Sequence, residues 1–243
     1  MALQKMHDGT IQAAIVAGGR GVRMRPATDQ LPKPMLLAGG KPILEHLVGW
    51  LQRSGVREAF MCLGYKAEAF SSYFGDGSRF GLRLDYRVES APRGTAGCVR
   101  DLGADVRGDL LVVYGDLFVD LDLGRLLEFH RRHDGVATLV VRESDHPLDS
   151  DLARTDGDRI TGFYRAKPGE SYENLACAAL WVVRPSLLES IPADRPTDFG
   201  KDIFPRALAA GQKLMAYRTA EPVFDVGTPE RVAAFERRWG PAR

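Results

Sequence analysis

Residues 13–26 read Ala-Ala-Ile-Val-Ala-Gly-Gly-Arg-Gly-Val-Arg-Met-Arg-Pro, and residues 31–36 read Leu-Pro-Lys-Pro-Met-Leu. A short apolar run therefore leads into a glycine-rich turn, and Arg23, Arg25 and Lys33 follow within a few residues. Glycines allow backbone N–H groups to approach a ligand closely, and nearby cations suit a polyphosphate. This stretch predicts a nucleoside triphosphate site at the start of the fold.

Strand and helix patterns alternate after this turn. Apolar runs predict strands at 11–17, 59–63, 82–87, 110–114 and 137–142. Helical spacing of apolar residues predicts helices at 42–53, 66–74, 94–102 and 123–133. The alternation predicts an α/β fold of Rossmann-like type, with a mixed, mostly parallel sheet and helices on both faces.

From residue 160 the pattern changes to short strands and hairpin-like turns. It predicts a strand at 176–183, a helix near 203–210, a strand at 215–217 and a last helix at 229–239. No repeat, low-complexity tract or linker divides the sequence. We therefore expect a single domain over residues 1–243, in which 11–120 form a nucleotide-binding half and 121–239 shape a second substrate pocket.

Composition excludes several classes of protein. A net charge of +1 gives no general reason to expect nucleic acid or an anionic membrane as partner. Three scattered cysteines argue against a disulfide framework or a zinc site and favour a reducing cytoplasm. Residues 1–10 lack the apolar core of a signal peptide, and no apolar run approaches the ~20 residues of a membrane span. The sequence leaves a homo-oligomer open.

The glycine-rich turn fits neither common nucleotide motif. A dinucleotide-binding fingerprint needs a third glycine, but Arg23 and Met24 follow Gly21, and the Gly-Lys-Ser/Thr of a Walker loop is absent. These differences argue against an NAD-dependent oxidoreductase. On its own, the turn is also compatible with a purely structural role.

The longer pattern resembles the sugar-1-phosphate nucleotidyltransferases. Residues 16–28 read Val-Ala-Gly-Gly-Arg-Gly-Val-Arg-Met-Arg-Pro-Ala-Thr, followed by Pro-Lys-Pro-Met at 32–35, Gly-Gly-Lys-Pro at 39–42 and Leu-Glu-His at 44–46. The match is to the short, single-domain branch of heptose- and mannose-1-phosphate guanylyltransferases. One departure is Val22, where the family usually has a threonine.

The resemblance implies a nucleotide-binding set in the first half. It places Ala17, Gly18, Gly19 and Gly21 around the triphosphate. Arg23 would contact the β and γ phosphates, and Lys33 would lie near the α phosphate, where the bond is exchanged. Residues 89–97 resemble the family's Glu-x-x-Pro-x-Gly-Thr-Ala-Gly segment, which implies that Glu89, Gly94 and Thr95 approach the base or ribose.

Two aspartates are candidate metal ligands. Asp116 follows the apolar strand at 110–114, and Asp225 lies in Val-Phe-Asp-Val-Gly-Thr-Pro at 223–229. In the family these motifs carry the carboxylates that hold Mg²⁺, and two carboxylates with phosphate oxygens and water suit that ion. Read alone, each aspartate is also compatible with a turn or capping role.

The second half keeps one family motif and departs from another. Lys167, in Phe-Tyr-Arg-Ala-Lys-Pro at 163–168, matches the lysine that clamps the sugar phosphate, so the resemblance counts it with Arg23 and Lys33 as catalytic. The expected contacts to the sugar itself are altered, and Asn174 is a nearby candidate to replace them. The altered positions are Ala166 for glutamate, Cys177 for asparagine, Ala179 for glycine and Trp181 for tyrosine.

Three further features have weaker interpretations. We expect His130 and His133 to lie on a solvated basic face rather than to bind a metal. The aspartates at 149, 151, 156 and 158 lack the spacing of a calcium loop and indicate an exposed hairpin region. Residues 199–205 resemble a family segment that closes the sugar pocket, with Lys201 and Asp202 as further candidate contacts.

The resemblance therefore implies transfer of a nucleotide from a nucleoside triphosphate to a sugar 1-phosphate, giving an NDP-sugar and pyrophosphate. GTP with a heptose- or mannose-type 1-phosphate, or with a sugar mimic such as a cyclitol phosphate, is the expected pair. A uridylyl- or thymidylyltransferase of the same fold is one alternative. A non-catalytic nucleotide-sugar sensor or regulatory subunit is the other.

Overall fold

The computed structural model describes residues 11–239, apart from the side chain of Arg23. Its first half is a parallel sheet built on the apolar run that precedes the glycine-rich turn. Ala13 and Ile15 pack into one core cluster and Ala14 into another, because successive strand side chains point to opposite faces. The strands of this parallel half are β5 (Arg83–Val88), β4 (Glu58–Leu63), β1 (Gln12–Val16) and β6 (Leu110–Tyr114).

The second half continues the same sheet with mostly antiparallel pairing. Strand β11 (Ala176–Val183) inserts between β6 and β8 and runs antiparallel to both. The full nine-stranded order is β5-β4-β1-β6-β11-β8-β12-β10-β9. The remaining strands of this antiparallel half are β8 (Ala137–Arg142), β9 (Leu152–Asp156), β10 (Arg159–Tyr164) and β12 (Leu214–Arg218), and β12 pairs in parallel with β8. The predicted mixed sheet is confirmed, with its parallel pairing concentrated in the first half.

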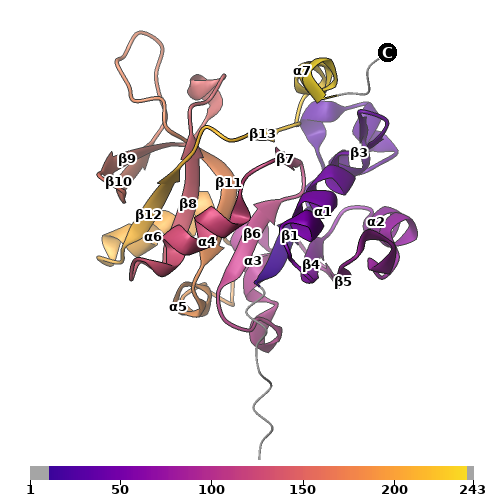
Figure 1. The fold of residues 1–243 in the computed structure, drawn as a ribbon, viewed down its shortest axis with the longest axis horizontal. Helices are drawn as coiled ribbons and strands as arrows, with labels where there is room; N and C mark the ends of the chain where they lie inside the picture. Colours follow the sequence, from indigo (N-terminus) through magenta and orange to yellow (C-terminus); the bar gives the residue numbers. More distant parts are fainter. Residues whose placement is uncertain (1–10, 240–243) are drawn as a thin grey trace, which may run out of the picture.

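Helices cover both faces of the sheet, as predicted (Figure 1). Each helix buries one apolar stripe against the strands; Leu44, Leu47 and Leu51 of α1, for example, are fully buried. One face carries α1 (Ile43–Arg53), α2 (Ala67–Phe74) and α4 (Leu123–Arg131). The other carries α3 (Gly94–Arg100), α5 (Pro185–Glu189), which the pattern did not predict, and α6 (Phe204–Ala209), which follows a π-helical turn at 199–203.

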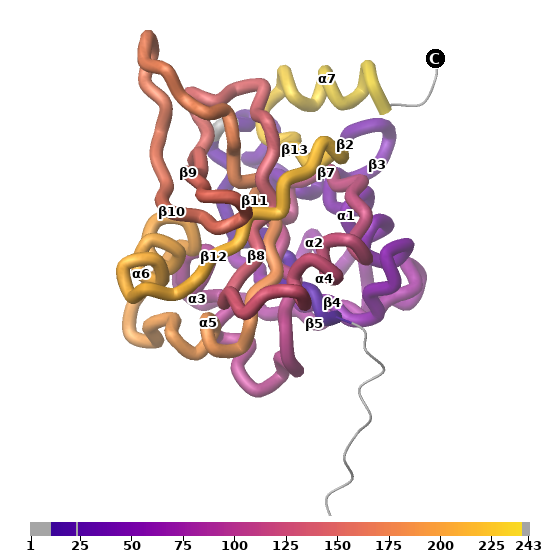
Figure 2. Tube along the Cα trace, turned by 60° about the vertical axis from the view of Figure 1, so that its left-hand side comes forward, coloured from indigo at the N-terminus to yellow at the C-terminus, as the bar shows by residue number. Residues whose placement is uncertain are grey.

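A small second layer lies where the parallel strands end. Strands β7 (Leu117–Val119) and β13 (Val223–Asp225) form an antiparallel pair that the sequence did not predict. Above it lies α7 (Pro229–Trp239), which buries Phe235 against the segment containing β2 (Leu37–Ala38) and β3 (Lys41–Pro42). Figures 1 and 2 both show α7 across the end of the molecule that holds β13.

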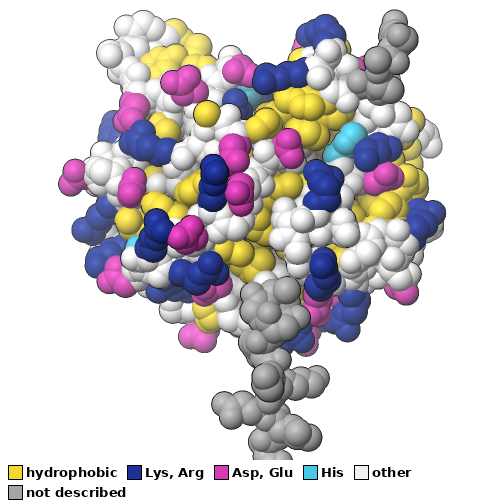
Figure 3. All heavy atoms as spheres, in the orientation of Figure 1, with side chains coloured by type: hydrophobic (Ala, Val, Ile, Leu, Met, Phe, Trp, Pro, Cys, Tyr) yellow, Lys and Arg dark blue, Asp and Glu magenta, His cyan; other side chains and the backbone are white. Residues whose placement is uncertain are grey.

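Charge is evenly distributed on the face shown in Figure 3, where basic and acidic side chains are interspersed. None of the helices among residues 11–239 combines the length and apolar character that crossing a membrane requires.

One surface expectation was wrong. His130 is 1% exposed rather than solvated, because α4 packs it against β8, where its Nδ1 and the Nε2 of His133 both contact the hydroxyl of Thr138. The expected hairpin region does occur, since β9 and β10 pair as neighbours around Asp156 and Asp158.

Candidate active site

The carboxyl ends of the parallel strands bring the predicted phosphate loop against Glu89. A side-chain carbon added to Gly18, after β1, would lie 3.0 Å from Glu89 Oε1, and one added to Gly64, after β4, would lie 2.9 Å from it. The second oxygen of Glu89 accepts the backbone N–H of Arg93 at 2.9 Å. The carboxylate therefore fixes the start of the segment that leads into α3, and a side chain at Gly18 or Gly64 would require Glu89 to shift.

The loop also packs directly on the predicted catalytic lysine. Gly21 has φ +60°, and a side-chain carbon there would lie 2.8 Å from Lys33 Cβ. Thr28 donates its hydroxyl to the carbonyl of Gly21 at 3.0 Å, which holds this conformation. Ala17 is buried and its N–H bonds to Cys62 of β4, whereas the space beside Gly19 is open. The side chain of Arg23 lies outside the described residues.

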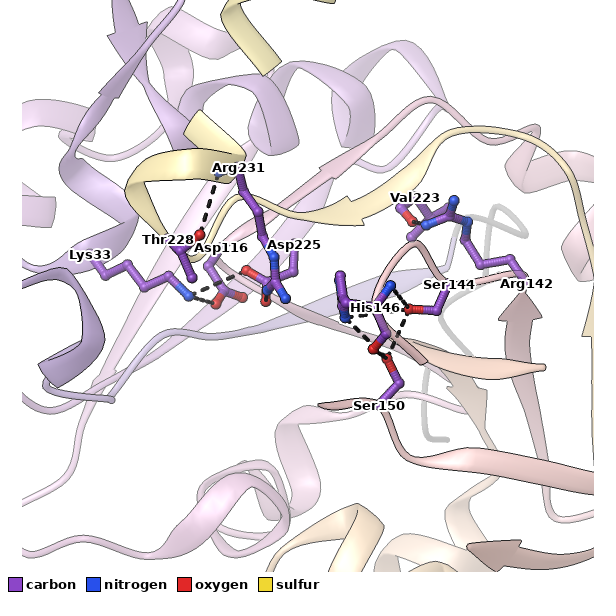
Figure 4. Close-up of polar contacts among 10 residues, drawn as sticks. All are labelled: Lys33, Asp116, Arg142, Ser144, His146, Ser150, Val223, Asp225, Thr228 and Arg231. Carbon is purple, nitrogen blue, oxygen red and sulfur yellow. Dashed lines mark hydrogen bonds and ion pairs between the residues drawn. The ribbon is translucent and has the colours of Figure 1, made fainter. Parts of the chain in front are cut away.

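Four charged side chains of alternating sign converge beside this loop (Figure 4). Lys33 Nζ contacts a carboxylate oxygen of Asp116 and lies 3.4 Å from Asp225 Oδ1. Arg231, from α7, contacts the other oxygen of Asp225. The Lys33 side chain is only 9% exposed, so its charge is balanced by the two carboxylates rather than by water. The predicted lysine and both predicted aspartates are thus brought together.

The β7–β13 pair sets the spacing of the two carboxylates. Asp225 is paired with Leu117, the residue after Asp116, and the N–H of Val226 donates to the Asp116 carbonyl at 2.9 Å. A side-chain carbon on Gly227 would lie 2.0 Å from Asp225 Oδ1 and 2.3 Å from Lys33 Nζ. The Asp-x-Gly order therefore leaves the space that the carboxylate and the ammonium occupy.

Two of the predicted nucleotide-binding residues are engaged within the protein. The N–H and hydroxyl of Thr95 both donate to Asp198 Oδ1, at 3.2 and 3.0 Å, and Phe199 N–H donates to the same hydroxyl. A side-chain carbon on Gly94 would lie 2.3 Å from the Thr197 carbonyl. These residues hold the start of α3 against the segment before α6.

A cavity of about 580 Å³ adjoins the charged cluster. Of the cluster, Asp225 and Arg231 line this cavity; the glycine loop, Lys33 and Asp116 are not among its lining residues. The altered stretch of β11, including Cys177, Ala179 and Trp181, forms part of the wall. The cavity therefore lies between Asp225 and the residues of β11 that depart from the family pattern.

The β11 wall is apolar and neutral. Burial raises the pKa of the Cys177 thiol to about 12, so it remains protonated at neutral pH. Ala179 has φ +52°, where the chain bulges and the pairing with β8 shifts. Trp181 packs edge-to-face against Tyr114, whose pKa is raised by burial, and against Phe204.

Polar groups line another part of the cavity, in a cluster that the sequence did not single out. The hydroxyls of Ser144 and Ser150 lie 2.9 Å apart and 3.4 and 3.2 Å from His146 Nδ1. Asn174, the candidate replacement for a sugar contact, instead accepts from and donates to the Ser144 backbone at 3.1 and 2.8 Å. Its amide therefore supports this wall rather than pointing an open donor at the cavity.

Lys167 is not brought to the charged cluster. Its side chain is 74% exposed in the segment after β10 and pairs with Glu170 at 3.7 Å. Ala166 is buried beside β9 and β11. In the 199–205 segment, Gly200 and Phe204 line the cavity, while Lys201 and Asp202 are exposed and absent from its lining.

The sequence interpretation missed Arg231 and Gly227, although both lie beside the predicted Asp225. The signal was present in Asp-Val-Gly-Thr-Pro-Glu-Arg, because an arginine in the first turn of a helix that follows a site carboxylate can turn back to it. The pairing of β13 with β7 could not be predicted from the sequence, because the two strands lie far apart along the chain.

Comparison with known proteins matches most of the chain to one family. The family described as nucleotidyl transferase matches residues 12–237. A mannose-1-phosphate guanylyltransferase of Mycobacterium tuberculosis is 33% identical over 225 residues, covering 90% of this chain and 62% of the relative. A UTP–glucose-1-phosphate uridylyltransferase of Synechocystis is 28% identical, covering 89% of this chain and 60% of that protein. The chain thus spans about three fifths of the length of these relatives.

Solved structures share the fold. HddC from Yersinia pseudotuberculosis, complexed with GMP-PN, superposes with a TM-score of 0.81 at 22% identity, covering 95% of this chain and all of HddC. A putative glucose-1-phosphate thymidylyltransferase from Bacillus anthracis superposes with a TM-score of 0.84 at 22% identity, covering 96% and 97%. At 22% identity, this structural similarity shows that the chain shares the fold of these proteins.

Proposed function

The chain belongs to the nucleotidyl transferase family, and we propose that it transfers a nucleotide from a nucleoside triphosphate to a sugar 1-phosphate. In this reaction a phosphate oxygen of the sugar 1-phosphate attacks the α phosphorus. A new P–O bond forms, the bond to the β phosphate breaks, and pyrophosphate leaves with its electron pair. The products are an NDP-sugar and pyrophosphate.

The observation that carries this proposal is the convergence of Lys33, Asp116 and Asp225 beside the glycine loop. Phosphoryl chemistry depends on positioning and on fixed charge more than on proton transfer. A buried ammonium next to the loop can stabilise charge on the α phosphate. The loop glycines allow the backbone to approach the triphosphate without a steric clash.

The two carboxylates also fit Mg²⁺, which we propose as the cofactor. They already converge on a cation, the Lys33 ammonium, and carboxylate oxygens are ligands that Mg²⁺ prefers. Mg²⁺ takes one or two carboxylates together with phosphate oxygens and water. When bound, Mg²⁺ would neutralise phosphate charge and orient the α phosphate.

The remaining sites are assigned by resemblance. In this proposal Ala17, Gly18, Gly19 and Gly21 surround the triphosphate, with Arg23 on its β and γ phosphates. Glu89, Gly94 and Thr95 border the base and ribose, and Lys167 reaches the sugar phosphate from the segment after β10. Three free cysteines favour a reducing cytoplasm as the location.

GTP with a mannose- or heptose-type 1-phosphate is the proposed substrate pair. Support comes from the motif pattern and from the relatives named mannose-1-phosphate guanylyltransferase, at 31–33% identity. The apolar β11 wall replaces polar residues of the family pattern, so the acceptor class extends to sugar mimics with fewer hydroxyls on that side.

A matrix of nucleoside triphosphates against sugar 1-phosphates, followed by pyrophosphate release with Mg²⁺, tests the proposal. We expect turnover with GTP and at least one mannose- or heptose-type acceptor. Turnover with UTP or dTTP alone would show that the donor is that nucleotide and not GTP. Tight nucleotide binding without turnover for any pair would identify a sensor and overturn the enzymatic proposal.

A further inference from the structure

The cavity and the charged cluster meet at two residues, Asp225 and Arg231. In the proposed reaction the phosphate of the acceptor must reach the α phosphate beside Lys33 and the carboxylates. A sugar that occupies the cavity therefore presents its phosphate at the end of the cavity that these two residues line. Of these two residues, Arg231 carries the positive charge that complements a phosphate.

Arg231 has free hydrogen-bonding capacity at this junction. Among the described residues, the one hydrogen bond of its guanidinium is the contact of Nη1 with Asp225 Oδ2. Its Nε–H and Nη2 hydrogens are left for a ligand, since a guanidinium carries five donors in a planar fork. The side chain is 20% exposed and α7 is anchored by Phe235, so the group is accessible but held in place.

The other arginines of the cavity make their contacts away from the charged cluster. Arg142 donates from Nη1 to the Val223 carbonyl at 3.0 Å and braces β13. Arg238 lies over the Trp239 ring, 4.4 Å from its centroid. Neither has a hydrogen bond or ion pair to the charged cluster among the described residues, and Lys167 is exposed and paired with Glu170.

We infer that Arg231 binds the phosphate of the sugar 1-phosphate, an assignment that rests on the proposed transfer reaction. Its planar fork holds two non-reacting phosphate oxygens, which leaves the third to face the α phosphorus. The contact with Asp225 fixes the direction of the guanidinium, so the acceptor phosphate is aligned with the carboxylate pair before the reaction. The C-terminal helix thereby supplies a substrate-binding residue to a site built mainly by the parallel strands.

The test compares Arg231→Gln with Arg237→Gln, which removes the same charge from an exposed position of the same helix outside the cavity lining. We expect Arg231→Gln to raise the KM for the acceptor about 10- to 100-fold, because a hydrogen bond to a charged group contributes about 1.5–3 kcal/mol. The KM for GTP should change less than about twofold. Arg231→Lys should recover part of the loss, since it restores the charge without the fork. Arg237→Gln should match the unmodified enzyme.

A second measurement separates phosphate binding from the positioning of Asp225. Calorimetric titration with mannose 1-phosphate, or with the acceptor that the matrix selects, should show binding weakened about as much as KM in Arg231→Gln. An unchanged acceptor affinity would overturn the assignment. So would an equal rise in the KM for GTP and in the Mg²⁺ requirement, which would make Arg231 a positioning residue for Asp225. If no combination of nucleoside triphosphate and sugar 1-phosphate is turned over, the transfer proposal fails. The titration with mannose 1-phosphate still shows, independently of turnover, whether Arg231 binds the sugar phosphate.

Discussion

The parallel and antiparallel halves of the sheet hold their polar groups in different ways. In the parallel half, polar side chains are held against backbone: Glu89 lies against Gly18 and Gly64, and Lys33 lies against Gly21. In the antiparallel half, the side chains of Ser144, His146 and Ser150 also contact one another. At Gly21 the first arrangement tolerates few residue types, because an added carbon would lie 2.8 Å from Lys33 Cβ and the backbone has φ +60°. In the proposed reaction the first arrangement would bind the triphosphate, and the second lines the cavity proposed for the acceptor.

The largest expected effect tests whether residues from both halves of the sheet form one catalytic centre. Asp116 follows the last strand of the parallel half, β6, whereas Asp225 lies in β13, which follows the antiparallel half in the sequence. Replacing either with asparagine should lower kcat by about 10³-fold or more, because fixed charge at the reacting phosphates is lost. Steady-state kcat at saturating Mg²⁺ measures this, with melting temperature as the check on folding.

The control is Asp134→Asn, which removes an exposed carboxylate paired with Lys213. We expect its kcat to remain unchanged. Near-normal turnover of Asp116→Asn or Asp225→Asn would contradict the metal assignment. A large loss in one and none in the other would show that the two carboxylates do not act as a pair.

The parallel half was predicted closely because its constraints are local. Short apolar runs ending in glycine or aspartate define β1 and β6, and steric need fixes Gly21. The β7–β13 pairing could not be predicted, since it joins three-residue strands more than a hundred positions apart. The contact of Arg231 with Asp225 depends on that pairing and on the placement of α7. The cavity walls depend on tertiary packing and were predicted only where the family pattern named them.

An intermediate effect concerns Lys167, which the family pattern and the structure treat differently. The pattern makes it the sugar-phosphate clamp, yet its side chain is largely exposed and pairs with Glu170. If it reaches the acceptor in the complex, Lys167→Ala should raise the acceptor KM or lower kcat about 10-fold, consistent with one charged hydrogen bond. Initial rates with varied acceptor and saturating GTP measure this.

Lys213→Ala serves as the control, because it removes an exposed lysine that pairs with Asp134. An unchanged acceptor KM together with an unchanged kcat in Lys167→Ala would remove it from the site. Recognition of the acceptor phosphate would then depend on α7 rather than on the segment after β10.

The smallest expected effect tests whether the β11 bulge requires a glycine-like backbone conformation although alanine stands where the family pattern has glycine. Ala179 stands where the family pattern has glycine, and it still adopts φ +52° in the β11 bulge. An alanine in this left-handed region carries about 1–2 kcal/mol of steric strain. Glycine removes that strain but loses about 0.4–1 kcal/mol through the greater freedom of its unfolded chain. Ala179→Gly should therefore stabilise the fold by about 0.5–1 kcal/mol and raise Tm by roughly 2 °C.

The neighbouring Ala178 is the matched control, because it is not among the residues with positive φ. Ala178→Gly should lower stability by about 0.5–1 kcal/mol, since glycine gains nothing there and costs chain entropy. Opposite signs in two thermal melts would show that the bulge demands a glycine-like conformation whichever residue occupies it. A loss of stability in both variants would mean that Ala179 is held without strain. The bulge would then be a feature that this wall acquired together with its apolar side chains, rather than a backbone it kept while they changed.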